Sequence, residues 1–267
     1  LDEVLVLARE QDDLACAASA LAMLSTIAWK WGDIEQAEEC CHESMTIYRE
    51  LGDRHKVSQL HNILGILATL QENYDQAEQY YEEGLALARE GDDRQIAADL
   101  LSNLGYLHHH STGNLGKAKR LYEESLLISR EIDHRSGATS TLINLGQLLI
   151  LLGEHRVAWK HLREALLESV AIGAVPLTLD ALVGVVQHQT EAGQYVSAAE
   201  LASLALSHPS LQIDSGQVAE LALDRLREVL PAEQLEAAMD RGKMLELDAV
   251  VAELEATVVP GDPSLRK

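Results

Sequence analysis

Apolar residues recur every three and four positions along most of the chain. Leu60, Leu64 and Leu67 show this spacing in one segment, and Ala77 and Tyr81 begin it in the next. A helix has 3.6 residues per turn, so these positions share one face that can be buried against a neighbouring helix. The pattern predicts pairs of amphipathic helices joined by short polar turns.

The pattern of paired helices repeats about every 40 residues. The dipeptide Arg-Glu begins at positions 9, 49, 89 and 130, in steps of 40, 40 and 41 residues. One alanine keeps the same spacing, at Ala37, Ala77, Ala118, Ala158 and Ala198. Both series lengthen by one residue in the interval before Gly113, which indicates a true repeat carrying one insertion.

The turns between the helices carry capping chemistry. Each repeat has a first and a second helix. Asp33 and Asn73 each precede the second helix of a pair, where a short side-chain acceptor can satisfy a backbone N–H. Gly32 precedes Asp33 and allows the left-handed conformation that ends the preceding helix. Arginines recur at the starts of the first helices: Arg54, Arg94 and Arg135. They could bind a ligand, but we expect them to pair with acidic residues of a neighbouring repeat.

Small residues in the first helices are followed at fixed distance by an alanine and then by a large residue. Gly65, Gly105 and Gly146 precede Ala77, Ala118 and Ala158 by 12 or 13 residues, and Tyr81, Tyr122 and Leu162 follow. This spacing resembles the tetratricopeptide repeat (TPR) family. The resemblance implies an all-α fold, a right-handed α-solenoid of about five antiparallel helix pairs with a helical C-terminal cap. The small residues would let paired helices approach closely.

The period and the resemblance together predict a domain organisation. Residues 1–13 would be the second helix of a truncated repeat, and five repeats would follow at 14–53, 54–93, 94–134, 135–174 and 175–213. All five prolines lie from Pro176 onward, where the regularity ends. Residues 214–257 would form a cap of three helices, with Pro231 starting the second, and 258–267 a flexible tail. Because Leu1 opens inside an amphipathic pattern, we expect the chain to be part of a longer protein.

The charge and cysteine content narrow the expected partners and compartment. With 21 basic and 43 acidic residues the net charge is −22, which repels phosphate backbones and anionic membranes. We therefore expect no direct nucleic-acid partner and no membrane partner. The cysteines Cys16, Cys40 and Cys41 form no CxxC pair, and we expect a cytoplasmic protein.

Candidate chemistry is sparse. His108, His109 and His110 are consecutive and point about 100° apart on a helix, so we expect no metal site and interpret them as helix surface. The segment from Gly113 to Lys117 lacks the spacing of a phosphate loop. No nucleophile, base and orienting group come together in any motif, so we expect no catalytic residues, no cofactor and no enzyme activity.

The family resemblance implies where a ligand would bind. In TPR proteins the first helices line the concave face of the superhelix, and by phase this face would carry Asn103 and Asn144, whose amides suit an extended peptide. Met23 and Thr26 would lie at the opening of the groove. The full predicted set is Trp29, Lys30, Asn62, Ile66, Thr69, Asn103, Tyr106, His109, His110, Asn144, Gln147 and Ile150.

The long repeats and the closing segment around Leu230 to Val250 resemble the C-terminal TPR arrays of bacterial signal-transducing (STAND-type) NTPases and LuxR-like regulators. That resemblance implies a sensor that binds a protein or peptide and reports to upstream nucleotide-switch and effector domains of the same chain. Two alternatives remain open: a free-standing adaptor or co-chaperone, and a sensor for a small molecule or short peptide.

Overall fold

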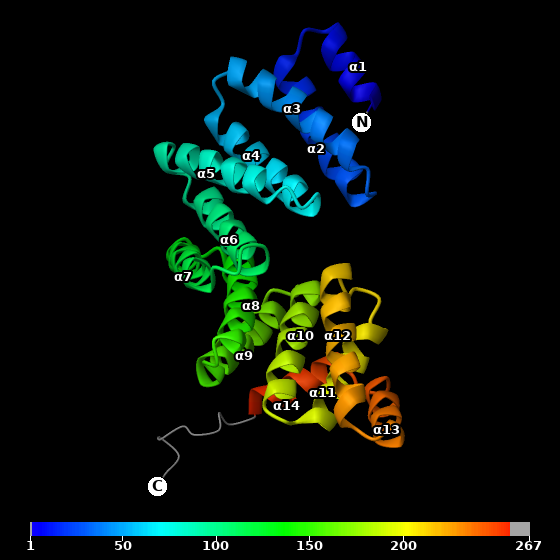
Figure 1. Cartoon of the computed structure of the whole chain (residues 1–267). Helices are drawn as coiled ribbons and strands as arrows, with labels where there is room; N and C mark the ends of the chain where they lie inside the picture. The colour runs from blue at the N-terminus through cyan, green and yellow to red at the C-terminus, as the bar shows by residue number, and fades with distance from the viewer. Residues whose placement is uncertain (1, 257–267) are drawn as a thin grey trace. The chain divides into compact units, whose positions relative to one another are not determined.

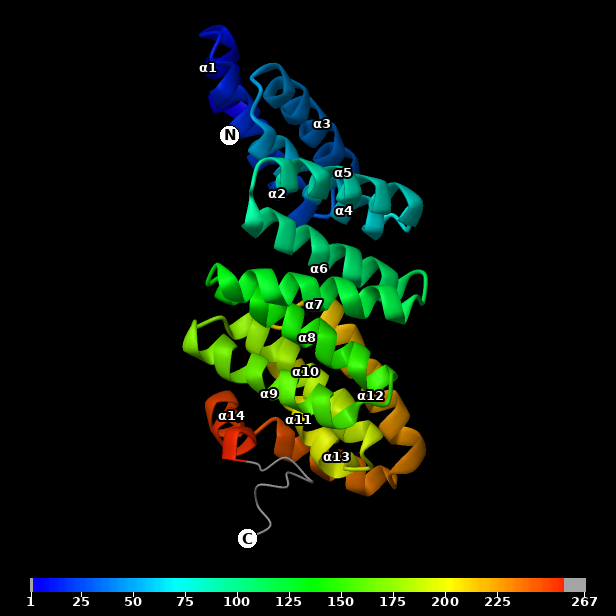
Figure 2. The ribbon, with the colours of Figure 1, turned by 90° about the vertical axis from the view of Figure 1, so that its left-hand side faces the viewer.

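The computed structural model describes residues 2–256, and this part of the chain contains fourteen α-helices and no strand (Figures 1 and 2). The fold is therefore the all-α, TPR-like solenoid that the sequence predicts. The chain divides into two compact units, Leu1–Asp133 and His134–Lys267. Every helix is assigned to one of these units.

The first unit holds seven helices, drawn from blue to green in Figure 1: α1 (Asp2–Glu10), α2 (Leu14–Lys30), α3 (Ile34–Glu50), α4 (Arg54–Leu70), α5 (Tyr74–Glu90), α6 (Arg94–His110) and α7 (Leu115–Glu131). Helix α2 packs on α3, α4 on α5 and α6 on α7, and consecutive pairs contact each other through α3 with α4 and α5 with α6. The extra residue before Gly113 lengthens the turn between α6 and α7 and leaves both helices intact.

The second unit holds the remaining helices: α8 (Arg135–Leu151), α9 (His155–Ala171), α10 (Val175–Glu191), α11 (Tyr195–Ser207), α12 (Ile213–Val229), α13 (Ala232–Gly242) and α14 (Leu247–Ala256). Pro231 directly precedes α13. Helix α14 packs against α9, where Arg163 Nη2 donates to the Glu255 carbonyl over 2.6 Å. The last residue of the predicted cap and the predicted tail, 258–267, lie outside the described residues.

Side-chain caps begin most helices of the first unit, as the turn pattern predicts. Asp33 accepts a hydrogen bond from the Gln36 backbone N–H at 3.1 Å, and Asn114 does the same for Lys117. Asn73 stands at the equivalent position of α5 and makes no such bond, which the sequence did not anticipate. Gly32, at φ +82°, ends α2 in the left-handed region, and Glu72 adopts the same region at φ +60°.

Close approach of paired helices explains the spacing of glycine and the large residue. A Cβ atom at Gly105 would lie 2.7 Å from Cδ1 of Tyr122, and one at Gly146 would lie 2.7 Å from Cγ of Leu162. Gly65 is in the same position against Tyr81. The sequence-based prediction of tight helix pairs is therefore confirmed in both units.

The arginines that begin the first helices pair with acidic residues. The prediction that these residues belong to a neighbouring repeat is wrong. Arg54 lies 3.2 Å from Glu90 and Arg135 lies 2.7 Å from Glu168, and Arg94 pairs with Glu131. Each partner belongs to the same helix pair and not to a neighbouring repeat. The reason is the antiparallel pairing, which returns the end of the second helix to the start of the first.

Between residues 2 and 256, no helix is long and apolar enough to cross a membrane.

Candidate functional site

Two asparagines on neighbouring first helices hydrogen-bond to each other. Nδ2 of Asn103 in α6 donates to Oδ1 of Asn62 in α4 over 2.7 Å, and both side chains are half-buried. An amide offers two N–H donors and an acceptor oxygen with two lone pairs, so each partner keeps hydrogen-bonding capacity beyond this one bond. The pair is thus held in a defined geometry and can still contact an extended backbone.

Four more of the predicted residues of the first unit remain partly or fully exposed. Ile66 and Thr69 follow Asn62 along α4 and are half-buried, and Thr69 Oγ1 donates to the Gly65 carbonyl at 2.8 Å. On α2, Trp29 packs partly against the core between α2, α3 and α4, whereas Lys30 is exposed. The surface of α4 therefore combines apolar and polar groups next to the asparagine pair.

Aromatic rings continue this surface along α6. The ring centroids of Tyr106 and His110 are 4.2 Å apart, and those of His110 and His109 are 4.1 Å apart. Tyr106 and His110 are exposed, but His109 is only 7% exposed and packs edge-on against Tyr122. The prediction that His109 faces a ligand is corrected here, because its side chain fills the space between α6 and α7.

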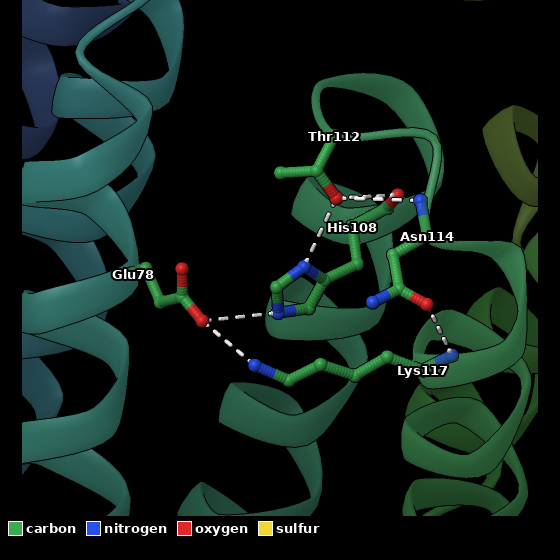
Figure 3. A network of polar contacts seen from close by, with 5 residues as sticks. All are labelled: Glu78, His108, Thr112, Asn114 and Lys117. Atoms are coloured by element: carbon green, nitrogen blue, oxygen red, sulfur yellow. Dashed lines mark hydrogen bonds and ion pairs between the residues drawn. The ribbon is translucent and has the colours of Figure 1, made fainter.

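His108 is also buried, contrary to the interpretation of the three histidines as helix surface. Its Nε2 lies 3.2 Å from Oε1 of Glu78 in α5, and the same oxygen is 2.7 Å from Nζ of Lys117 in α7 (Figure 3). The hydrogen bond from Lys117 lowers the pKa of Glu78, and burial lowers the pKa of His108. Together these contacts tie three consecutive helices together.

The three histidine rings do not come together at one point. The His109 and His110 rings lie side by side, whereas His108 faces Glu78 on another side of the helix. Within residues 2–256, no group of three or more His, Cys, Asp or Glu side chains could hold a metal ion.

The predicted residues of the second unit lie on α8. Asn144 and Gln147 are half-buried, whereas Ile150 is only 7% exposed. Ile150 is a core residue and drops out of the exposed set. Asn144 holds the position of α8 that Asn103 holds in α6, and its contact with a ligand stays a prediction.

Sequence reasoning missed one buried polar residue, His61 of α4. Its side chain is 1% exposed, and the equivalent position of every other repeat holds a buried leucine: Leu21, Leu101, Leu142 and Leu182. The signal was present in the sequence, because His61 interrupts an otherwise constant leucine position.

The tetratricopeptide repeat family matches residues 1–90 and 96–166, more than half of the chain. The chain belongs to the tetratricopeptide repeat family. TPR arrays are protein-binding scaffolds and are generally not catalytic.

Several solved structures share the TPR fold of this chain. BtubC (BKLC) from P. vanneervenii is 19% identical, with a TM-score of 0.61 over 90% of this chain and 87% of its own. Aspartyl phosphate phosphatase F from Bacillus subtilis is 14% identical, with a TM-score of 0.58 over 91% of this TPR chain and 61% of its own. The apo form of RapI is 13% identical, with a TM-score of 0.55 over 94% and 93%. No curated protein matches the sequence.

Proposed function

We propose that this TPR chain recognises a protein or peptide ligand through the first helices of its first unit. The observation that carries the proposal is the hydrogen bond between Asn62 and Asn103. It fixes two amides on adjacent helices, and their remaining donors and acceptors match those of an extended peptide backbone. Tyr106, at 36% exposure one turn after Asn103 on α6, supplies an aromatic contact, and Lys30 is an exposed cation at the end of the first helix α2.

The ligand-binding set is the exposed or half-buried part of the predicted residues of the first unit: Trp29, Lys30, Asn62, Ile66, Thr69, Asn103, Tyr106 and His110. Concave surfaces built from first helices are where solenoid repeats usually bind, which supports this assignment. We assign no enzyme activity to the chain, because the family consists generally of scaffolds and the buried His108 contacts serve to join helices.

The wider role follows the resemblance of the long repeats to bacterial signalling arrays. In this proposal the chain is the cytoplasmic sensor part of a larger NTPase or regulator, and ligand binding favours one state of an upstream nucleotide switch. The excess of acidic residues supports a protein or peptide partner over nucleic acid or an anionic membrane surface.

A displayed library of random peptides, selected against the chain, tests the recognition step. Peptides selected by the parent should bind the Asn62→Ala/Asn103→Ala double variant at least about ten-fold more weakly, because two amide contacts are lost. Removing both partners of the mutual bond leaves neither one unsatisfied, so the melting temperature should change little. Asn73→Ala is the matched control, since Asn73 is exposed and makes no cap bond. Equal affinity of parent and double variant would rule out this site.

The larger-protein context has its own test. The intact mass and peptide map of the protein from its source cells should show nucleotide-binding peptides upstream of Leu1. A native chain of about this length would instead favour the alternative that the protein is a free-standing adaptor.

A further inference from the structure

A cavity of about 600 Å³ lies beside the turn between α3 and α4 in the first unit. The end of α3, the start of α4 and the second half of α5 line it, and His61 is among the lining residues. Small-molecule sites commonly occupy about 300–1,000 Å³ and combine apolar walls with a few convergent polar groups. The lining of this cavity has that composition.

His61 is the first unusual group of the cavity. Nη2 of Arg49 lies 3.4 Å from His61 Nε2, and a guanidinium can only donate, so Nε2 is the acceptor and the ring proton resides on Nδ1. Burial lowers the pKa of His61, which keeps the ring neutral near pH 7. The Nδ1 donor is buried and has no hydrogen-bond partner. An unsatisfied buried donor costs stability, and the leucine that the other repeats carry here would not have that cost.

Arg49 is the second unusual group. The arginines at the equivalent positions of the flanking helices form ion pairs, Arg9 with Glu43 and Arg89 with Glu124. The residue that corresponds to those glutamates is Glu83, and its Oε2 lies 3.8 Å from His61 Nδ1 instead. Arg49 has no carboxylate partner in the described part of the chain. Its guanidinium is exposed and available to an oxyanion.

The remaining lining supplies a second cation and an apolar wall. Arg54 lies 3.2 Å from Glu90, but both side chains are more than 60% exposed, so this pair is weak and can exchange. Val57 is buried and Leu87 half-buried, and both face the cavity together with Tyr48. Glu83, with 52% of its side chain exposed, places a negative charge beside the two arginines. A ligand with a carboxylate, a nearby N–H group and an apolar side chain matches this arrangement.

We propose that this cavity binds the carboxylate end of an apolar amino acid, either free or at the C-terminus of a peptide. Arg49 and Arg54 contact the carboxylate, Glu83 accepts from the N–H group on the neighbouring carbon, and His61 Nε2 accepts from Arg49 and so holds the guanidinium in place. Val57 and Leu87 contact the side chain. This site is independent of the asparagine pair, because His61 and Asn62 are consecutive and point in directions about 100° apart on α4.

Calorimetric titration with three probes tests the proposal: L-leucine, N-acetyl-L-leucine and L-leucinamide. At least one of the first two should bind saturably, whereas L-leucinamide, which lacks the carboxylate, should bind at least about ten-fold more weakly. Tighter binding of L-leucine points to a free amino acid as the ligand, because Glu83 then pairs with the ammonium group of L-leucine. Tighter binding of N-acetyl-L-leucine points to a peptide terminus.

Two variants and one matched control complete the test. His61→Leu restores the residue that every other repeat carries, so the melting temperature should stay the same or rise while binding falls at least about ten-fold. Arg49→Gln should weaken binding similarly, whereas Arg89→Gln removes the equivalent arginine outside the cavity and should leave it unchanged. The proposal is overturned if neither carboxylate probe binds, if L-leucinamide binds as tightly, or if His61→Leu retains parental affinity.

Discussion

Thr69 and His109 occupy the same position in consecutive repeats, and each lies beside a tyrosine of the following helix. Thr69 Oγ1 lies 3.4 Å from the hydroxyl of Tyr81, whereas His109 packs edge-on against Tyr122. Neither His109 Nδ1 nor the Tyr122 hydroxyl has a hydrogen-bond partner. Burial, with a smaller contribution from His110, lowers the pKa of His109 to about 4. His109 is therefore neutral in the folded state and charges on unfolding in mild acid.

His109→Thr should make the protein less sensitive to acid. Between an unfolded pKa of 6.5 and a folded pKa of about 4, only the unfolded state binds the proton, so the free energy of unfolding falls as the pH drops through this window. The loss amounts to at most about 3 kcal/mol, and the variant should not show it. Denaturant melts of both proteins at a series of pH values measure the difference.

Burial also lowers the pKa of His61 and of His108, so the quantity that tests His109 is the difference between the variant and the parent. Parallel curves for His109→Thr and the parent from pH 7 to about pH 4 would contradict the assigned burial of His109.

Gly105→Leu should destabilise the first unit. Even a Cβ at this position would lie 2.7 Å from Tyr122 Cδ1, so a leucine must force α6 and α7 apart at a cost of about 1–3 kcal/mol. Gly116→Leu is the matched control, because Gly116 is exposed on α7 and has no atom within 4 Å of the added Cβ. That control should be neutral or gain up to about 1 kcal/mol from helix propensity. Equal melting temperatures for the two variants would mean that the helix register is wrong.

The limits of prediction at the residue scale follow from what periodicity measures. It identified Gly105 and Tyr122 as a close pair, because their spacing reflects a contact that each repeat must make. It could not show that His109 is buried, because a polar side chain can stand on a helix face wherever a neighbouring ring packs against it. Which side chains receive it depends on the three-dimensional packing of α5 and α7.

At the scale of the helices, the turn residues specify where most second helices begin. Asp33 and Asn73 hold the same N-cap position, but only Asp33 accepts a hydrogen bond from the backbone. Residue type alone therefore predicted the position of both caps and only one of the bonds. The arginine pairs show a similar limit, since a regular spacing does not reveal whether a partner comes from the same helix pair.

Asp33→Ala should cost about 1 kcal/mol of stability, because it removes a side-chain cap, whereas Asn73→Ala should cost much less. Both positions are exposed N-caps of second helices, so they form a matched pair. Chemical denaturation of the two variants measures the contrast. A larger loss for Asn73→Ala than for Asp33→Ala would contradict the capping geometry.

For the whole molecule, the sequence predicted the fold class and the family, since a 40-residue period and its small-residue pattern are properties of the entire array. The division after Asp133 was not predicted, because the period passes through that position without interruption. The ligand was not predictable either. Repeats conserve the contacts between helices, whereas the exposed positions of the first helices are free to differ from one protein to another.

The central claim is that the asparagine pair on α4 and α6 contacts a bound peptide. The most direct measurement follows the side-chain amide signals of Asn62, Asn103 and Asn73 by NMR while a peptide selected by display is added to the intact chain. We expect the signals of Asn62 and Asn103 to shift with the same saturation curve, while that of Asn73 stays in place. If the peptide saturates the protein and the Asn62 and Asn103 signals do not move, recognition occurs elsewhere and the claim is wrong.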